Sequence, residues 1–310
     1  MASWVVEQVF WALSKVRLVP SIPAPFEDRL ARLPPEATSI DNDIYNQASF
    51  DWTEGGCGLH LLNPVRVGYF LDKLERYELS RDDSRSEAVT VLDLGCGAGI
   101  ATEAVYRALD SHRRSSQTSE QKRTYRVIGI DMSRRSIDLA KSRAKQHVMS
   151  IEYIVGDVYK LPLDDASIDG IICSDVLEHL LDLPSAFQEI HRVLKPQGIL
   201  TFDTINRTPV SYYLSIWILQ DILKAMQGDA HDHKLYVTPQ ETKTLMLRSG
   251  LQPGPHSDLV GMRPGLQFPH VALFRLFTGR GFIASFLAEF KLTRDLSISY
   301  LHWCSKASES

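Results

Sequence analysis

The sequence predicts an α/β fold of the Rossmann-like type: a mostly parallel twisted sheet with helices on both faces, plus an N-terminal helical cap. Short apolar runs rich in strand-forming residues alternate with longer helical patterns, which is typical of a parallel sheet. Polar residues or glycines follow each of the first four runs, at 90–94, 126–130, 152–155 and 170–173. Ligands bind beyond the carboxyl ends of such strands, so the same pattern indicates where a site would lie.

The composition is that of an ordinary globular protein. The 310 residues are 44% hydrophobic and 23% charged, which suits one large domain with additions. A net charge of −4 disfavours a nucleic-acid-binding surface, which is usually basic. The four cysteines form no C-x-x-C pair and indicate a reducing, intracellular compartment; Cys96 and Cys173 are expected to be small packing residues, and the others are Cys57 and Cys304.

The first twenty residues carry a broad apolar face that includes Trp4 and Trp11. The segment is too short to span a bilayer and lacks the basic leader and cleavage site of a secretory signal. It either packs on the domain as an N-terminal helix or lies in a membrane interface. Five prolines interrupt residues 20–40, so we divide the chain into a helix and arm at 1–40 and one domain at 41–310.

An aromatic segment precedes the first strand. Tyr45, Phe50 and Trp52 alternate with polar residues, and Asn63-Pro64 predicts a helix start, because proline is favoured in a first helical turn. Arg66 lies on this helix. Its guanidinium would match a carboxylate ligand with two parallel hydrogen bonds; the alternative is a surface arginine paired with Asp72.

A glycine-rich turn follows the first strand. Gly95, Gly97 and Gly99 come after Asp93 in the pattern D-x-G-x-G-x-G, in which the third glycine is one residue early for a dinucleotide-binding fingerprint. Such a turn brings the backbone close to a ligand, although a plain tight turn into the next helix is equally compatible. Residues 110–125 are hydrophilic without periodicity and predict an inserted loop before the second strand.

Acidic residues follow the second and third strands. Asp131 ends the second strand, where a carboxylate can accept both hydroxyls of a ribose; the alternative is that it caps the helix beginning at Ser133. Met132 follows it directly. Asp157 comes after the third strand, and Ser174 ends the fourth. These residues should therefore line one edge of the sheet.

Asp175, Glu178 and His179 stand at i, i+3 and i+4, so a helical turn would place them on one face. Such a set could hold Mg²⁺ through the carboxylates, or Mn²⁺ or Zn²⁺ with the imidazole. The alternative is that they cap a helix and shape a pocket.

The second half of the domain predicts helices at 186–194 and 241–249 and strands at 198–204 and 297–305. Residues 212–226, within an insertion at 208–235, are too apolar for a surface helix and predict a roof over the site, a membrane contact, or both. A second insertion at 265–295 contains the aromatic-rich stretch 268–290, which we interpret as helical material beside the acceptor pocket.

The D-x-G-x-G-x-G turn resembles the first motif of class I S-adenosylmethionine (SAM) dependent methyltransferases. A tryptophan-containing acidic segment, then L-H-x-x-N-P-x-R-x-G-Y, then N-R and H-D at 206–207 and 231–232 narrow the resemblance to the ubiquinone-biosynthesis O-methyltransferase family. It covers about residues 41–264 and 296–305. The chain departs from the family pattern at three positions, with Asp175 for Glu, Asp203 for Ser and Ala230 for Thr.

The resemblance implies a class I methyltransferase fold and SAM as the cofactor. Arg66 would bind the cofactor's carboxylate and Asp157 its adenine amino group. The candidate cofactor-binding residues are Arg66, Asp93, Gly95, Gly97, Asp131, Met132, Asp157 and Ser174. The family's E-x-x-E-H element is a metal site, which would make Asp175, Glu178 and His179 ligands of Mg²⁺ or another divalent cation.

The implied reaction is methylation of a phenolic or catechol hydroxyl, on a polyprenyl dihydroxybenzene or demethylubiquinol. His231 would take the hydroxyl proton, with His179 as the competing base; the alternative for His231 is a turn histidine bonded to Asp232. Two other functions stay open, a natural-product O-methyltransferase and a non-catalytic SAM-binding, membrane-docking partner in a biosynthetic complex. The expected location is cytoplasmic or on the mitochondrial matrix side, peripheral to the inner membrane.

Overall fold

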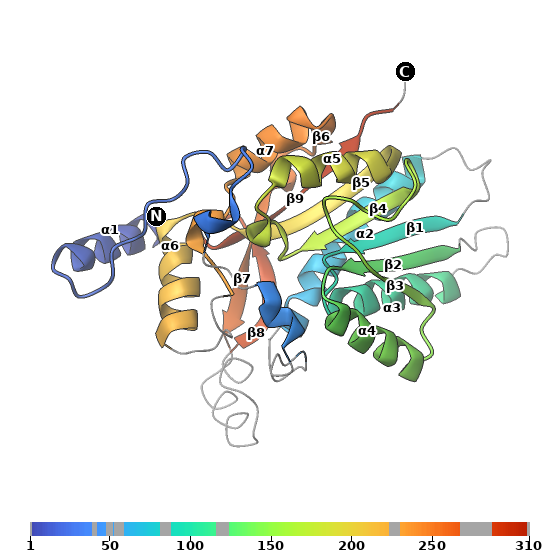
Figure 1. Ribbon diagram of the computed structural model, residues 1–310, viewed down its shortest axis with the longest axis horizontal. Coiled ribbons are helices and arrows are strands. Elements are labelled where there is room, and N and C mark those ends of the chain that lie inside the picture. The colour runs from blue at the N-terminus through green and yellow to red at the C-terminus, as the bar shows by residue number, and fades with distance from the viewer. Residues whose placement is uncertain are drawn as a thin grey trace.

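A computed structural model describes residues 2–38, 42–47, 52, 59–80, 88–115, 124–222, 230–266 and 287–308. At its centre is a nine-stranded sheet in the order β3-β2-β1-β4-β5-β9-β7-β8, with β6 paired to β9 (Figure 1). Strands β1 to β5 are parallel, and β9, β7, β8 and β6 are antiparallel to their neighbours. Their bounds are β1 Val89–Leu94, β2 Tyr125–Asp131, β3 Ile151–Val155, β4 Ile168–Ser174, β5 Leu194–Ile205, β6 Leu251–Pro253, β7 Val260–Leu266, β8 Leu287–Thr293 and β9 Ser299–Lys306. The predicted mostly parallel α/β fold is confirmed.

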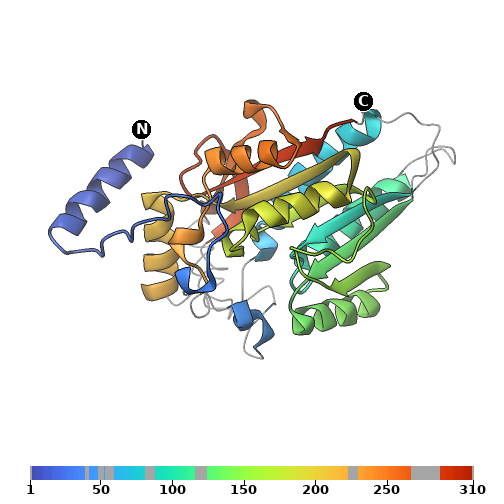
Figure 2. The same ribbon diagram turned by 45° about the horizontal axis from the view of Figure 1, so that its top comes forward.

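Helices cover both faces of the sheet. α2, α3 and α4 pack on one face, and α5 and α7 pack on the other (Figure 2). The helix bounds are α1 Ala2–Lys15, α2 Asn63–Ser80, α3 Ile100–Ser115, α4 Arg134–Gln146, α5 Leu183–Val193, α6 Pro209–Ser211 and α7 Pro239–Arg248. α6 continues into a π-helix, η6 Tyr212–Ile222, and short 3₁₀ turns lie at η2 Asn42–Asn46, η5 Leu177–His179 and η7 His233–Leu235.

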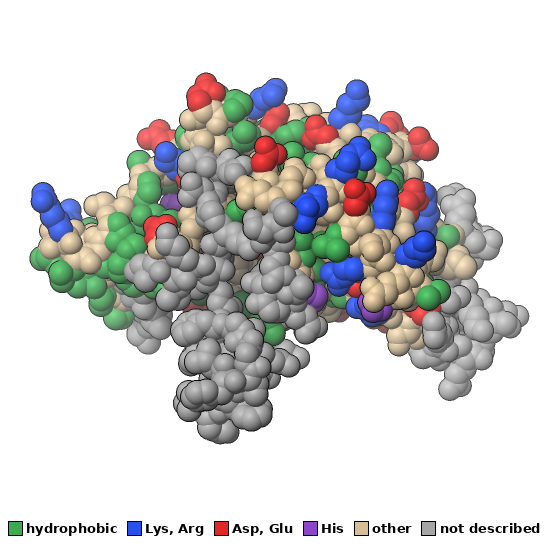
Figure 3. All heavy atoms as spheres, turned by 60° about the horizontal axis from the view of Figure 1, so that its bottom comes forward, with side chains coloured by type: hydrophobic (Ala, Val, Ile, Leu, Met, Phe, Trp, Pro, Cys, Tyr) green, Lys and Arg blue, Asp and Glu red, His purple; other side chains and the backbone are tan. Residues whose placement is uncertain are grey.

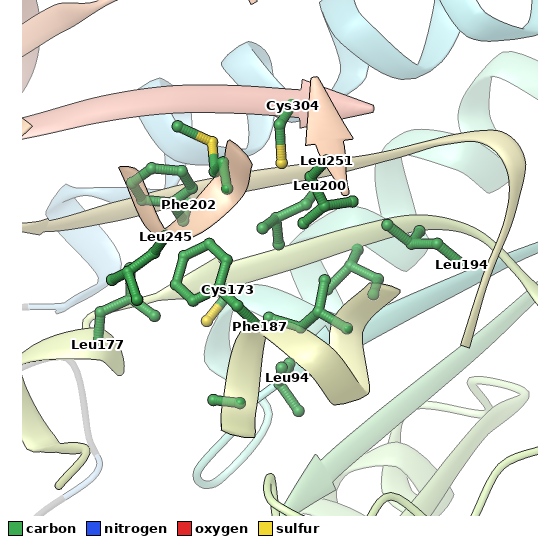
Figure 4. Packing of buried hydrophobic residues seen from close by; sticks show 14 of the residues in the cluster. Leu94, Cys173, Leu177, Phe187, Leu194, Leu200, Phe202, Leu245, Leu251 and Cys304 are labelled. Atoms are coloured by element: carbon green, nitrogen blue, oxygen red, sulfur yellow. The ribbon is translucent and has the colours of Figure 1, made fainter. Parts of the chain in front are cut away.

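The core lies on both sides of β1, which is buried along its whole length. Such a strand carries apolar residues on both faces, as expected for a parallel sheet covered by helices. Leu94 and Phe187 belong to the larger cluster, on the α5 side, together with Cys173 and Cys304 (Figure 4). Cys96 is also buried, beside α4, so the expected packing role of Cys96 and Cys173 is confirmed; Cys57 lies outside the described residues.

Three segments differ from the sequence-based prediction. α3 extends to Ser115, so the first part of the predicted loop at 110–125 is helical, and residues 116–123 lie outside the described part. Residues 212–222 of the stretch predicted at 212–226 form the π-helix η6, and residues 223–226 lie outside the described part. Residues 287–290 belong to β8, a strand rather than a helix, because they pair with β7; the rest of the stretch 268–290 is not among the described residues.

The N-terminal helix α1 packs on the domain through one face. Phe10 stacks on Tyr213 of η6 with ring centroids 4.2 Å apart, at one end of the molecule (Figures 1 and 2). The arm that follows is fixed by Arg29, which is fully buried and donates hydrogen bonds to the carbonyls of Leu180 and Leu235 at 2.8 and 3.2 Å. Among the described residues, no helix is long and apolar enough to cross a membrane.

Candidate active site

The site lies where the strand order reverses. From β1 the chain builds β2 and β3 on one side and then places β4 and β5 on the other. After β1 and β4 the chain therefore continues to opposite faces of the sheet, into α3 and α5, and such a switch point is where parallel sheets bind ligands. The loops that directly follow the two strands are in close contact, since a Cβ added at Gly95 would lie 2.3 Å from Val176 Cγ2.

The glycine turn needs glycine both for its backbone and for its packing. Gly95, Gly97 and Gly99 have φ of +75°, +50° and +81°, which disfavour residues with a Cβ. A Cβ at Gly97 would lie 2.6 Å from Trp52 Cη2, and one at Gly99 would lie 2.3 Å from the Tyr153 hydroxyl oxygen. A tight packed turn therefore accounts for the glycines, and a ligand at this corner would lie beside Trp52.

Asp93 is buried beneath this turn. Its Oδ2 accepts a hydrogen bond of 2.5 Å from the Thr102 hydroxyl. Burial raises the pKa of Asp93 to about 6, although the bond from Thr102 favours the ionised form. The carboxylate therefore changes charge near neutral pH.

Asp131 connects the end of β2 to the glycine turn. Its Oδ2 accepts from Gly97 N and its Oδ1 from Ser133 N, both at 2.8 Å. Ser133 itself caps α4 by accepting from Ser136 N at 3.2 Å. The capping alternative is thus partly correct, but each carboxylate oxygen retains a second lone pair that can accept a ribose hydroxyl.

Met132 and Asp157, the predicted cofactor-binding residues that follow β2 and β3, lie at the protein surface. Met132 is 69% exposed, and Asp157 is exposed after β3, with its Oδ1 accepting from Tyr159 N at 2.9 Å. Because β1, β2 and β3 are neighbours, the structure brings Asp93, Asp131 and Asp157 to one edge of the sheet. Ser174 ends β4 on the other side of β1, and its buried hydroxyl has no hydrogen-bond partner in the described part of the chain.

Arg66 is buried and neutralises two carboxylates. It pairs with Asp203 at 2.8 Å and with Asp175, while Asp72 pairs with Lys73 and Arg76 instead. The predicted alternative of a surface arginine paired with Asp72 is therefore wrong. Burial alone would raise the pKa of Asp175, but Arg66 outweighs it and lowers that pKa. Burial raises the pKa of Asp203 to about 7 despite Arg66.

The predicted metal ligands do not form an ion site in this structure. Asp175 has φ +52° and is followed by one 3₁₀ turn, so Asp175, Glu178 and His179 do not share an α-helical face. Asp175 is held by Arg66. Glu178 accepts from the Thr204 hydroxyl at 2.7 Å, and burial raises its pKa to about 8, which favours a neutral acid. Within the residues that are described, no three His, Cys, Asp or Glu side chains are placed to hold one ion.

His179 and His231 come together from distant parts of the chain. Their ring centroids are 5.2 Å apart, and the buried Nδ1 atom of each has no hydrogen-bond partner among the described residues. Burial lowers the pKa of His179 to about 3 and that of His231 to about 4, so both imidazoles are neutral. Asp232 accepts a hydrogen bond from Lys234 N at 3.0 Å. It therefore caps the 3₁₀ turn η7 and is not bonded to the His231 ring.

Sequence reasoning missed two residues of this region. Asp203 was noted only as a departure from the family's Ser, yet it is a buried partner of Arg66. Tyr45 lies with its ring centroid 6.0 Å from that of His179 and 5.9 Å from that of Trp52. The available signals were an acid near the end of an apolar strand, and aromatics in an otherwise polar segment.

Comparisons with known proteins agree with this geometry. A family model described as a methyltransferase domain matches residues 85–247. A ubiquinone biosynthesis O-methyltransferase of Bartonella bacilliformis is 30% identical over 197 residues, which cover 63% of this chain and 73% of that protein. The chain belongs to the SAM-dependent O-methyltransferases. A second such relative, the ubiquinone biosynthesis O-methyltransferase of Rhizobium etli, is 27% identical over 245 residues, 78% of this methyltransferase and 84% of the relative.

Membership confirms the predicted class I methyltransferase fold, the enzymatic activity and SAM as the methyl donor. An O-methyltransferase also requires a small-molecule acceptor.

Proposed function

We propose that this methyltransferase transfers the methyl group of SAM to a phenolic or catechol hydroxyl, on a polyprenyl dihydroxybenzene or demethylubiquinol. Two relatives that are named ubiquinone biosynthesis O-methyltransferases support the acceptor class. The observation that carries the proposal is the pair of neutral imidazoles, His179 and His231, beside the carboxyl ends of β4 and β5. A neutral imidazole is the form that accepts a proton from a phenol.

The residues around the glycine turn fit the donor. SAM carries a sulfonium and an ammonium, which suit the carboxylate of Asp93, and its ribose suits Asp131. Arg66 Nε and Ser174 Oγ are buried polar atoms without partners in the part of the chain described, so each can still bond a ligand. Arg66 would then hold the donor's carboxylate, with Gly95 and Gly97 against the backbone and Met132 and Asp157 at the adenine end.

Methyl transfer needs alignment and a deprotonated acceptor oxygen. SAM supplies an activated methyl group, whose bond to sulfur breaks as the bond to oxygen forms. His231 or His179 takes the hydroxyl proton, since both imidazoles are neutral and lie side by side. Asp175 raises the pKa of both imidazoles, but His231 lowers the pKa of His179, so His231 has the higher pKa of the two, about 4 against about 3, and is the favoured base.

The test is methyl transfer from labelled SAM to a short-chain demethylubiquinol or dihydroxybenzene analogue. We expect transfer by the wild type, and a loss of about 10²- to 10⁴-fold in kcat for His231→Gln with SAM binding unchanged. His147→Gln, at an exposed position after α4, is the matched control and should keep full activity. Failure of the wild type to methylate any catechol acceptor while it binds SAM would contradict the proposal.

We further propose that the protein contacts a membrane surface through α1, because a polyprenyl acceptor resides in lipid. Half of the twelve exposed large hydrophobic residues in the described chain lie between positions 4 and 18. Figure 3 shows hydrophobic side chains gathered at the end of the molecule where α1 lies. They are Trp4, Val5, Val9, Trp11, Val16 and Leu18, with Trp4 65% and Trp11 59% exposed. Tryptophans beside apolar residues are typical of helices in a membrane interface.

The helix η6 links this surface to the histidines. The ring of its Tyr213 stacks on Phe10 of α1, and the Oε1 atom of its Gln220 accepts a hydrogen bond from His231 N at 3.2 Å. An acceptor tail leaving the histidines would therefore run along η6 toward α1, and η6 would roof the site.

Cosedimentation with phosphatidylcholine vesicles tests this contact. Trp4→Ser with Trp11→Ser should reduce the bound fraction about tenfold and leave activity on a short-chain soluble acceptor unchanged. Leu247→Ser, an exposed apolar position on α7, is the matched control and should bind vesicles like the wild type. Unchanged binding by the double variant would remove α1 from the proposal.

A further inference from the structure

Four rings form a continuous row from the glycine turn to the proposed base. The indole of Trp52 lies on Gly97, and neighbouring ring centroids are then 5.9 Å (Trp52 to Tyr45), 6.0 Å (Tyr45 to His179) and 5.2 Å (His179 to His231) apart. Tyr45 meets His179 edge to face, at 87°. The row therefore joins the turn proposed to bind the donor to the imidazoles proposed to act on the acceptor.

The backbone at Tyr45 is held by two serines at the start of α4. Ser133 Oγ lies 3.1 Å from the Tyr45 carbonyl oxygen and 2.8 Å from Asn46 Oδ1. Ser136 Oγ donates to the same Tyr45 carbonyl at 3.3 Å. Since Asp131 accepts from Ser133 N, these bonds hold the backbone at Tyr45 beside the carboxylate proposed to bind the donor's ribose.

The surroundings of Tyr45 suit a cation. Its hydroxyl keeps its proton, because burial and the charges of Glu178, Asp175 and Asp131 all raise its pKa. A neutral ring presents the negative face of its π-system, and acids lie on both its cofactor side and its acceptor side. Aromatic faces attract cations within about 6 Å of the ring centroid.

We propose that Tyr45 and Trp52 bind the sulfonium of the methyl donor through their ring faces, and thereby favour the charged donor over the neutral product. The sulfur of SAM joins its ribose to its amino-acid part, so it lies between Asp131 and the glycine turn when those residues bind it. Trp52 lies against Gly97 of that turn, and the ring of Tyr45 contacts the ring of Trp52, so both aromatic side chains adjoin this position. S-adenosylhomocysteine keeps the same ribose and amino acid but has a neutral thioether, which gains no such attraction. This inference rests on SAM as the donor and not on the identity of the acceptor.

Calorimetric binding of SAM, S-adenosylhomocysteine and sinefungin, a donor analogue with an ammonium at this position, tests the proposal without turnover. For Tyr45→Leu and Trp52→Leu we expect SAM and sinefungin to bind about 10-fold more weakly, and S-adenosylhomocysteine less than about 2-fold more weakly. Tyr45→Phe keeps the ring and should keep the preference for charged ligands. Tyr106→Leu, a half-buried aromatic position on α3 away from the turn, is the matched control and should alter none of the three affinities.

Equal losses for the charged and neutral ligands, or no loss for either, would overturn the proposal. A loss of preference in Tyr45→Phe would also overturn it, because the hydroxyl and not the ring face would then be responsible. The outcome is separate from that of the acceptor proposal, since failure to methylate catechols leaves these binding ratios unaffected.

Discussion

At the scale of single residues, Asp93 couples donor binding to pH. Its pKa of about 6 lies above the usual range, so the carboxylate forms as pH rises through that value. The ionised fraction increases from about one tenth at pH 5 to about nine tenths at pH 7. Because SAM is positively charged, we predict up to about a 10-fold gain in SAM affinity over this interval, measured by calorimetry.

Asp93→Asn serves as the control for this dependence. The amide still accepts from Thr102 but does not titrate, so the variant should show a smaller gain in SAM affinity between pH 5 and 7 than the wild type. The folded-state pKa of Asp93 is raised, so the wild type should also lose stability as pH rises from about 4 to about 6; Asp93→Asn should lose less, with the remaining loss due to Asp203 and Glu178. An unchanged pH profile in Asp93→Asn would show that another group is responsible.

Arg66 is the counterion of a buried acidic pair. Arg66→Leu leaves Asp175 and Asp203 without a positive partner, and we predict a loss of about 3–5 kcal/mol in the free energy of unfolding, measured with urea. Adding Asp203→Asn should recover part of the loss, because one of the two acids is removed. If Arg66→Leu is as stable as the wild type, the cluster does not carry the charge balance inferred here.

At the scale of elements, the glycine turn is set by packing against β3. Gly99→Ala places a methyl group against the Tyr153 hydroxyl in a left-handed backbone, and we predict a loss of about 2–3 kcal/mol in stability. Tyr153→Phe removes the nearest atom and should restore part of it. Gly68→Ala is the matched control: it lies in α2 with nothing within 4 Å of the added Cβ, and should stabilise the protein by about 0.5–1 kcal/mol. Equal effects of the two alanines would contradict this account.

At the scale of the whole molecule, Asp169 ties three elements together. This fully buried acid on β4 accepts from Thr90 N of β1 at 2.8 Å, from the Tyr77 hydroxyl of α2 at 2.9 Å and from Lys195 Nζ of β5 at 2.8 Å. Asp169→Ala removes the acceptor of the buried Thr90 N–H and Tyr77 hydroxyl and the carboxylate paired with the partly exposed Lys195, and we predict a loss of about 3–5 kcal/mol in global stability. Hydrogen exchange should rise in β1, β4 and β5 together.

A surface ion pair provides the comparison for Asp169. Arg126 and Glu152 are about half exposed, so Glu152→Ala should cost less than about 1 kcal/mol. A similar cost for the two substitutions would show that Asp169 has no special structural role.

The parallel half of the sheet was predictable because its signals are local. Each run from β1 to β4 is apolar and is followed by a residue type that ends strands, so both the strands and the row of acids beyond them could be read from neighbouring positions. The extension of α3 to Ser115 was not predictable, because residues 110–115 show no helical periodicity. The strand at 287–290 was not predictable either, because β8 forms by pairing with β7.

The residues of the candidate site were predictable only where their place follows from the strand next to them in the sequence. Asp93, Asp131 and Asp157 are such residues, because each lies at or just after the end of a predicted strand. The pairing of Arg66 with Asp203, the approach of His179 to His231 and the place of Tyr45 each join residues far apart in sequence. No periodicity reports such contacts, and the assumption of an α-helical turn after β4 gave a metal-ligand face that the 3₁₀ turn does not form.

The buried Arg29 has a practical consequence for anyone who trims or tags this protein. Because its guanidinium donates hydrogen bonds to the carbonyls of Leu180 and Leu235, Arg29 joins the N-terminal arm to the segments that carry His179 and His231. Deleting residues 2–34 would remove the hydrogen-bond donor of both carbonyls. A tag fused before α1 leaves these hydrogen bonds intact, so it is the safer choice for purification, provided that it is removed before any vesicle assay.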